Sequence, residues 1–397
     1  MAFSYMVELE GNDGFILNTD LLDTGLLGYL SEDVTQYVRS VTCKRGKSTS
    51  QDRFTAGQLS VVFDNRTRVF DPSYTSSPLY GAIVPRRKIR FYAGYDANSL
   101  HSQFVGFIDD WDFDYDVSGD STATASASDA FTVLAQQNMT MAAPPAEISD
   151  ARAERVITNP QVAWPIDDFY TEGAAITVNT VAYSGNALDY LLQLAESEQG
   201  LLYVNRSGVL TFLGWNYFAK APLDIVTPDV TFSDGAFVPG FPFSRLQTNY
   251  GTDQLYNYVT VTGSAGTVTA QDTTSQQDYR VASTDLDVLT NGTAQMQLLA
   301  NNLIDTYKNP VFRISGIEVP IDGYEQFYLP SVVLGSAAVS TIFQADFGYI
   351  VEVYYTPNGT GTVNGDTGVL IGKTVTATPA GCAVSFELGA YQYRSVI

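Results

Sequence analysis

The chain has 397 residues and a formal net charge of −22, because 43 Asp and Glu residues stand against 21 Lys and Arg residues. An apolar content of 45% excludes a disordered acidic tail, and the negative charge excludes non-specific nucleic-acid binding over the whole surface. Asp is far commoner than Glu, Lys is scarce, and Tyr, Phe, Val and Thr are abundant, so the composition predicts a mainly β protein.

Alternating apolar and polar residues predict strands in the first third of the chain. The clearest strand patterns cover 58–64, 88–94 and 104–116, and the last alternates aromatic with acidic side chains. Residues 128–135 are expected to form a short capped helix. The small-residue, proline-containing stretch 139–145 is expected to end the first domain.

The middle of the chain has the pattern of an α+β unit. A short helix is predicted over 150–157, and the strongest helix pattern of the sequence follows over 186–198, where leucines recur on one face. Asn186 is a suitable N-cap for this helix, and Gly200 can end it. A β-hairpin over 201–213 is expected next.

Strand patterns return after residue 243, with one helix expected over 294–307. The predicted strands of this part lie at 258–262, 266–270, 348–355 and 384–388, with a turn region at 357–368. The whole pattern therefore predicts a mainly β fold with α+β inserts. The expected domains are 1–146, which is β; 147–240, which is α+β; and 241–397, which is mainly β with the one helix.

Positive charge is concentrated in one segment. Residues 39–90 hold 11 of the 21 basic residues and three acids, a net charge of +8, which leaves −30 for the rest of the chain. This asymmetry favours docking or self-assembly of a basic segment against an acidic neighbour, although solvated loops and strand faces would give the same count. The candidate basic interface residues are Arg45, Arg53, Arg66, Arg68, Arg86, Arg87, Lys88 and Arg90.

Four aspartates alternate with aromatic residues in the predicted strand 104–116. These residues are Asp110, Asp112, Asp114 and Asp116. The spacing is not that of an EF-hand, because the sixth and twelfth positions hold Tyr115 and Ser121 rather than Gly and Glu. We interpret the aspartates as an acidic strand face that contacts solvent, a partner or a channel lumen. An adventitious divalent ion and a catalytic role are the alternatives.

No residue pattern predicts a specific enzyme. The single histidine, His101, lies in a polar stretch with no nucleophile motif beside it, and Cys43 and Cys382 are expected to be passive thiols. With 43 acids, a close pair of carboxylates is no evidence for a glycosidase. We expect no catalytic activity, no metal site and no cofactor. The sequence also has neither a stretch of about 18 apolar residues nor a secretory signal, so no membrane anchor is expected.

An ordered series of motifs resembles the minor tail proteins, or baseplate hub proteins, of long-tailed bacteriophages. The motifs are Asp52-Arg-Phe-Thr-Ala-Gly57, Val61-Val-Phe-Asp-Asn65, Arg68-Val-Phe-Asp-Pro72, Ser76-Ser-Pro-Leu-Tyr-Gly81, Phe104-Val-Gly-Phe-Ile-Asp-Asp-Trp111, Ser128-Asp-Ala-Phe-Thr-Val-Leu-Ala135, Glu198-Gln-Gly-Leu-Leu-Tyr-Val204 and Leu255-Tyr-Asn-Tyr-Val-Thr-Val-Thr262. Together they extend over nearly the whole chain. Their residues are of the kinds that build turns and scaffolds rather than active sites.

The resemblance implies a structural protein of the virion, located at the tail tip and assembled in the host cytoplasm. It implies tandem β-barrel-like hub domains, three copies of which form a ring around the DNA exit channel, with a smaller helix-and-hairpin domain attached. The implied partners are a distal tail or tail tube ring, the tape measure protein, fibre and tip proteins, and DNA in transit. Two alternatives remain: a sixfold distal tail or adaptor ring, and a carbohydrate-binding or carbohydrate-active β protein that acts on the host envelope.

Overall fold

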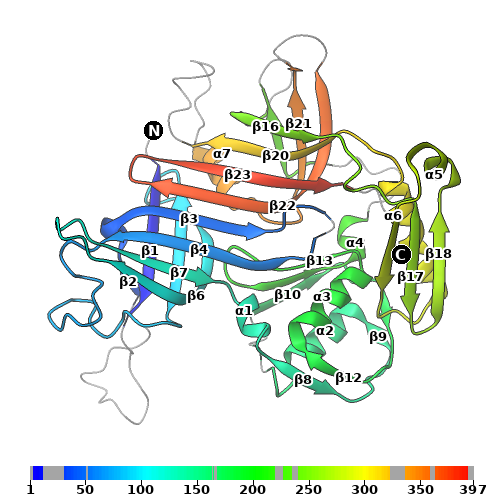
Figure 1. Ribbon diagram of the computed structural model, residues 1–397, viewed down its shortest axis with the longest axis horizontal. Coiled ribbons are helices and arrows are strands. Elements are labelled where there is room, and N and C mark those ends of the chain that lie inside the picture. The colour runs from blue at the N-terminus through cyan, green and yellow to red at the C-terminus, as the bar shows by residue number, and fades with distance from the viewer. Residues whose placement is uncertain are drawn as a thin grey trace.

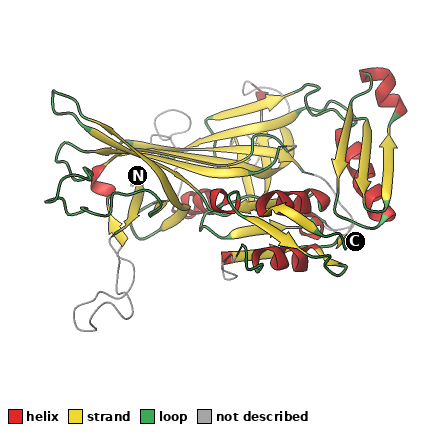
Figure 2. Ribbon diagram, turned by 60° about the horizontal axis from the view of Figure 1, so that its bottom comes forward, coloured by secondary structure: helices red, strands yellow, loops and turns green. Residues whose placement is uncertain are grey.

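The computed structural model describes residues 3–11, 31–50, 52–162, 164, 168–219, 227–234, 240–321, 336–357 and 363–391. Within these residues the main feature is a 13-stranded sheet, which is antiparallel except for one pair of strands. Helices of the middle domain lie along one side of this sheet, and a smaller unit lies at one end of the molecule (Figure 1, Figure 2). The mainly β fold class with α+β inserts is confirmed.

The N-terminal half of the main sheet has the strand order β3-β4-β7-β6-β5-β1-β2. Its elements are β1 (Ser4–Glu10), β2 (Ser31–Asp33), the 3-10 helix η1 (Thr35–Tyr37), β3 (Val38–Gly46), β4 (Thr55–Asp64), β5 (Lys88–Gly94), β6 (Leu100–Asp114) and β7 (Thr122–Ser128). The strands predicted at 58–64, 88–94 and 104–116 are confirmed as parts of β4, β5 and β6, although β6 ends at Asp114.

The C-terminal half continues the same sheet with the order β16-β20-β23-β22, and β21 joins β15 to β22. Its elements are β15 (Val230–Ser233), β16 (Arg245–Asn249), β20 (Arg313–Pro320), α7 (Ser336–Gln344), β21 (Ile350–Tyr355), β22 (Asn364–Thr378) and β23 (Gly381–Ala390). The expected turn region 357–368 is partly wrong, because 364–368 already belong to β22, where they pair with β21. Residues 358–362 of that region lie outside the described residues.

The two halves join where β3 pairs with β22. The pairing is antiparallel and runs from Gly46 opposite Gly372 to Val41 opposite Ala377. Each half also forms a hairpin next to this pair, β3 with β4 and β22 with β23. We call this β3–β22 pairing the seam.

The middle domain packs two longer helices with small sheets. Its elements are α1 (Phe131–Leu134), β8 (Asn138–Met141), β9 (Glu147–Ile148), α2 (Ser149–Ile157), β10 (Phe169–Glu172), β11 (Thr177–Val178), β12 (Tyr183–Asn186), α3 (Ala187–Ser197), β13 (Leu201–Val204), β14 (Leu210–Leu213) and α4 (Trp215–Phe218). Asn186 caps α3 as expected, since its Oδ1 accepts hydrogen bonds from the amides of Leu188 at 2.9 Å and Asp189 at 3.2 Å. The predicted hairpin is formed by β13 and β14.

A smaller unit has its own three-stranded sheet, in the order β18-β17-β19. Its elements are β17 (Tyr258–Gly263), β18 (Gly266–Gln271), α5 (Thr273–Tyr279), β19 (Ser283–Asp287) and α6 (Thr293–Tyr307). The expected helix over 294–307 is therefore confirmed as α6. The core of this unit includes Val259, Val261 and Leu299 and is completed by Ile176 and Trp215 of the middle domain. The boundaries expected at 146 and 240 stay a prediction.

Candidate functional site

Three aspartates of the predicted acidic face lie on β6 and are exposed to solvent. Asp110, Asp112 and Asp114 stand opposite Ser126, Thr124 and Thr122 of β7. The aromatic side chains between them stack on one another: the ring centroids of Trp111 and Phe113 lie 6.2 Å apart, and those of Phe113 and of Tyr115, which follows the end of β6, lie 6.3 Å apart. Asp116 is also exposed but follows the end of the strand. The proposed role of this face stays a prediction.

The acidic face has no metal-binding arrangement. Throughout the described residues, no group of three or more His, Cys, Asp or Glu side chains could hold a metal ion. Burial raises the pKa of the Cys43 thiol to about 11, which keeps the sulfur protonated and unreactive at neutral pH. Among the helices described, none is long and apolar enough to cross a membrane.

Much of the positive charge in residues 39–90 is neutralised inside the chain. Five of the eight candidate basic residues pair with carboxylates: Arg45 with Asp346, Arg53 with Glu196, Arg66 with Asp64, Arg68 with Asp71 and Arg90 with Glu8. Arg39 of the same segment pairs with Asp120 at 2.6 Å. The local excess of positive charge in the sequence is therefore much smaller on the folded surface.

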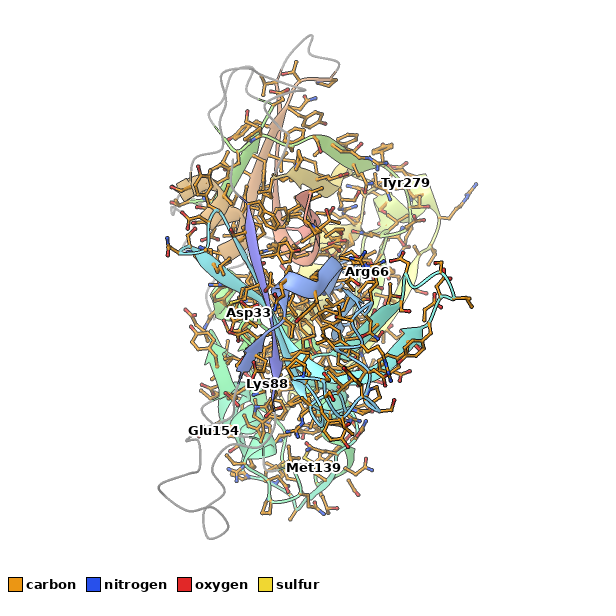
Figure 3. All side chains as sticks on the ribbon, turned by 90° about the vertical axis from the view of Figure 1, so that its left-hand side faces the viewer. Asp33, Arg66, Lys88, Met139, Glu154 and Tyr279 are labelled. Atoms are coloured by element: carbon orange, nitrogen blue, oxygen red, sulfur yellow. The ribbon has the colours of Figure 1, made fainter. Side chains whose placement is uncertain are left out.

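Arg86, Arg87 and Lys88 lie beside the start of β5. Arg86 is exposed and has a φ of +68°, in the left-handed region that is unfavourable for residues with a β-carbon. The Lys88 ammonium lies 5.9 Å from the centre of the Phe107 ring. Figure 3 labels Lys88 together with Arg66, which is exposed in the loop after β4. A role of these cations in assembly stays a prediction.

Arg45 corrects the expected interface, because it is buried within the chain and only 4% exposed. Its Nη2 lies 2.9 Å from Asp346 Oδ1, its Nη1 donates to the Val204 carbonyl at 3.3 Å, and its guanidinium lies 4.9 Å from the centre of the Phe347 ring. The sequence contains a signal of this burial that we missed. Arg45 is in phase along β3 with Val41 and Cys43, which are both buried.

The Arg45–Asp346 pair connects three parts of the chain. Arg45 belongs to the N-terminal half, Asp346 follows α7 in the C-terminal half, and Asp346 Oδ2 accepts a hydrogen bond from the Arg206 amide in the hairpin of the middle domain at 2.8 Å. In the same hairpin, the Tyr203 hydroxyl donates to the Phe347 carbonyl at 3.0 Å. This interior junction fixes the middle domain against the seam.

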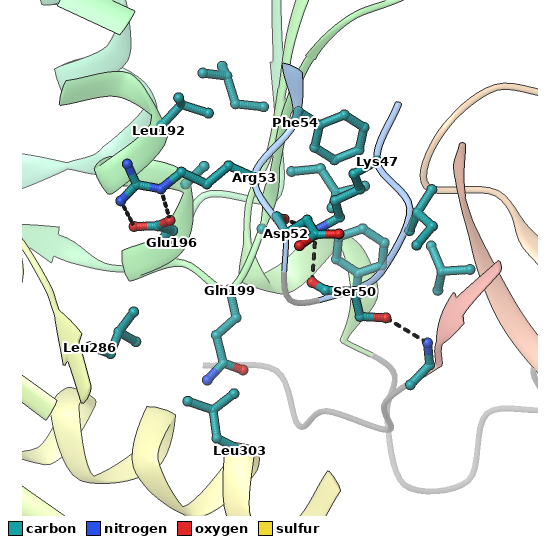
Figure 4. A pocket seen from close by; sticks show the side chains of 18 of the residues that line it. Lys47, Ser50, Asp52, Arg53, Phe54, Leu192, Glu196, Gln199, Leu286 and Leu303 are labelled. Carbon is teal, nitrogen blue, oxygen red and sulfur yellow. Dashed lines mark hydrogen bonds and ion pairs between the residues drawn. The ribbon is translucent and has the colours of Figure 1, made fainter. Parts of the chain in front are cut away.

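A cavity of about 250 Å³ lies beside the junction, where residues 47–50 and 52–54 meet α3, the small unit and the end of β23 (Figure 4). Phe54, Leu286 and Leu303 contribute apolar walls. At its edge the Arg53 Nη2 donates to Glu196 Oε2 at 2.8 Å, which links this loop to α3. The polar groups around the cavity are thus used to hold neighbouring parts of the chain together.

Lys47 also stabilises the connection between β3 and β4 at this cavity. Its Nζ donates to the carbonyls of Ser50 at 2.9 Å and Asp52 at 3.0 Å, and burial lowers its pKa to about 8. These two hydrogen bonds close the loop between β3 and β4 on itself. The lysine is therefore a structural group of the loop.

We predict that breaking the buried ion pair destabilises the chain strongly. Replacing Arg45 alone, as Arg45→Met, removes the ion-pair partner of the buried Asp346 carboxylate and lowers the free energy of unfolding by about 3–5 kcal/mol in urea denaturation. The double variant Arg45→Met/Asp346→Leu removes both charges and recovers most of this loss. Equal losses in the single and double variants would contradict the assignment.

Three carboxylates have lowered pKa values in the folded chain, and we therefore predict that the chain loses stability in acid. Hydrogen bonds from Arg66 lower the pKa of Asp64 to about 2, those from Ser73 and Arg68 lower that of Asp71 to about 2, and those from Arg155 and Arg152 lower that of Glu147 to about 2. Unfolded Asp and Glu titrate near pH 4, so the unfolded state binds more protons between about pH 4 and about pH 2. The stabilisation is present above about pH 4 and is lost as the pH falls toward 2.

The test is the melting temperature as a function of pH in this range. The Asp64→Asn/Asp71→Asn variant is less stable at neutral pH and loses less stability on acidification than the unmodified chain. Asp112→Asn, which changes an exposed aspartate with no ion pair in the described structure, serves as the control and keeps the original slope. An unchanged slope in the Asp64/Asp71 variant would refute this explanation.

Two solved structures that share the fold of this chain are tail proteins, whereas no protein-family model and no curated protein matches it. A tail protein from Neisseria meningitidis MC58 has a TM-score of 0.58 and 12% identity, with 97% of this chain and 96% of that chain covered. The 43 kDa tail protein of prophage MuSo2 from Shewanella oneidensis has a TM-score of 0.53 and 11% identity, with 98% and 100% covered. The resemblance found in the sequence is thus confirmed at the level of the fold: this chain has the fold of these tail proteins.

Proposed function

We propose that the chain is a structural tail protein, a hub whose copies form a trimeric ring around the DNA exit channel. The shared fold supports a tail-associated role. The ring is supported by the seam, because each chain supplies one sheet half on either side of it and three chains would supply six halves. No catalytic activity belongs to this proposal.

The observation that carries the proposal is the solvent face of the sheet across the seam. Two rows of side chains run in register over β23, β22, β3, β4 and β7, and we call them together the hydroxyl face. The first row is Ser385, Thr374, Lys44, Gln58 and Ser128, and the second is Ala383, Thr376, Thr42, Ser60 and Ser126. All ten residues are exposed or half-buried, and seven are Ser or Thr.

This composition suits a wall past which DNA slides. A cation that captures a phosphate adds affinity that opposes movement, and Lys44 is the one cation in the two rows. The acidic residues of β6 extend the second row beyond β7, since Asp110 stands opposite Ser126. Repulsion between these carboxylates and DNA is limited by screening beyond about 8 Å at physiological salt. Short hydroxyl side chains leave a flat, hydrated surface.

The remaining parts of the chain fit contacts with other tail components. We propose a distal tail or tail tube ring, the tape measure protein, and fibre or tip proteins as neighbours, in a virion tail assembled in the host cytoplasm. The domains 1–146, 147–240 and 241–397 are retained as the proposed units. The exposed Arg86 and the half-buried Lys88 are candidates for contacts between copies or rings.

Mass photometry of the purified protein tests the ring. The chain has a mass of 43.2 kDa, so a trimer is expected at about 130 kDa, three times that value. A species near six times the chain mass would support the sixfold adaptor ring instead. A monomer at all concentrations, together with glycan binding or glycan release, would favour the carbohydrate-active alternative and overturn the hub.

Introducing cations tests the hydroxyl face. Thr42→Lys/Ser60→Lys/Ser126→Lys places three lysines in one row, and we expect duplex DNA binding in fluorescence anisotropy with a log–log salt slope of up to about −0.9 for each phosphate contacted. The unmodified ring is expected not to retain DNA at the same salt concentration.

The matched control places the same charge on the small unit, as Thr262→Lys/Thr267→Lys/Thr269→Lys. These three threonines are also exposed on strands. Because lysines from three chains would converge around one channel only in the first variant, that variant should bind at least about tenfold more tightly. Equal affinities would contradict a channel position for the hydroxyl face.

A further inference from the structure

A buried lysine of β22 holds the end of helix α7. Lys373 is 2% exposed, and its Nζ donates to the carbonyls of Ile342 at 3.1 Å, Phe343 at 2.9 Å and Ala345 at 3.0 Å. These carbonyls belong to the last turn of α7 and the residue after it, where a helix leaves acceptors without internal partners. Lys373 therefore caps the C-terminus of α7 from a neighbouring strand.

Helix α7 crosses the seam. It belongs to the C-terminal half in sequence, but it packs against β5 and β6 of the N-terminal half. The ring of Phe343 stacks on that of Phe3 with centroids 6.1 Å apart, and Gln103 Nε2 of β6 donates to the Phe343 carbonyl at 3.1 Å. The docking of α7 thus ties the two halves together, and Lys373 contacts it from the centre of the sheet.

The charges around Lys373 do not balance its own charge when it is protonated. Arg45 and Cys43 approach from β3, Arg206 from the β13–β14 turn, Asp346 from the segment after α7, and His101 from β6. The one nearby carboxylate, Asp346, is already paired with Arg45 at 2.9 Å. Burial, followed by the charge of Arg45, lowers the pKa of Lys373 to about 7.

We propose that docking of α7 on the seam is coupled to loss of a proton from Lys373. The neutral amine still donates two hydrogen bonds to the end of α7 and needs no counter-charge. The ammonium adds a third hydrogen bond, but it places an unpaired positive charge beside two arginines in a closed interior. Docking is therefore tight when the amine is neutral and looser when it is protonated.

Proton linkage gives the direction in which α7 docking depends on pH. An undocked, solvated Lys373 has a pKa near 10.4, so the undocked state binds more protons between about pH 7 and about pH 10. Docking should strengthen about tenfold for each pH unit in this interval and be constant below it. Arg45 and Arg206 stay charged throughout, the thiol of Cys43 stays protonated because its pKa is raised to about 11, and the pKa of His101 is lowered by burial, which leaves it neutral.

Hydrogen exchange with mass spectrometry tests the coupling on the intact protein. After correction for the intrinsic pH dependence of exchange, protection of amides at 336–345 is expected to rise about 100-fold from about pH 7.5 to about pH 9.5. Amides of α6, which is remote from Lys373 in the small unit, serve as the internal reference and should show no such rise. A rise of the same size throughout the chain would report global unfolding and overturn the assignment to α7.

Variants at Lys373 test whether this residue causes the rise of α7 protection with pH. Lys373→Met removes the titrating group and abolishes the slope, and Lys373→Arg keeps a permanent charge and gives low, pH-independent protection of α7. Lys44→Met, at the exposed position opposite Thr374, retains the slope of the unmodified chain. A slope that persists in Lys373→Met, or its absence from the unmodified chain, would overturn the proposal. If neither Lys373 variant folds, the comparison of α7 with α6 in the unmodified chain still decides.

Discussion

The pairing of β3 with β22 is the constraint on which the rest of the structure depends. These strands are more than 300 residues apart in the sequence, yet their antiparallel register makes one sheet from the two ends of the chain. The middle domain and the small unit are carried between them as insertions. The buried Arg45–Asp346 pair is one side-chain contact that joins the two halves beside this pairing.

Charge is divided between the interior and the surface in a way that fits a passage for a polyanion. Arginines that are concentrated in one segment of the sequence pair with carboxylates within the chain, and the separate Lys373 of β22 holds the end of α7. The sheet face across the seam is left to hydroxyl groups and is bordered by the aspartates of β6. The formal charge of −22 is therefore mostly a property of the surface.

Local features of the fold could be predicted from the sequence because they depend on neighbouring residues. The helix capped by Asn186 and the alternating strand β6 are examples. The seam could not be predicted, because strand pairing over hundreds of residues leaves no local pattern. The basic neighbours of Arg45 in the sequence indicate a surface cation, whereas its partner Asp346 lies 301 residues away. Lys373 is in phase with the buried Val375 and Ala377, but the α7 carbonyls that it contacts, 28 to 31 residues earlier, leave no local pattern in the sequence.

The central claim is that this sheet forms the wall of a channel in an assembled ring. A cryo-electron microscopy reconstruction of the purified assembly tests it most directly. The account predicts threefold symmetry, with β22, β3, β4 and β7 around the axis and Thr42, Ser60 and Ser126 directed into the lumen. A ring in which this face points outward, or in which it is buried against another chain, would contradict the account.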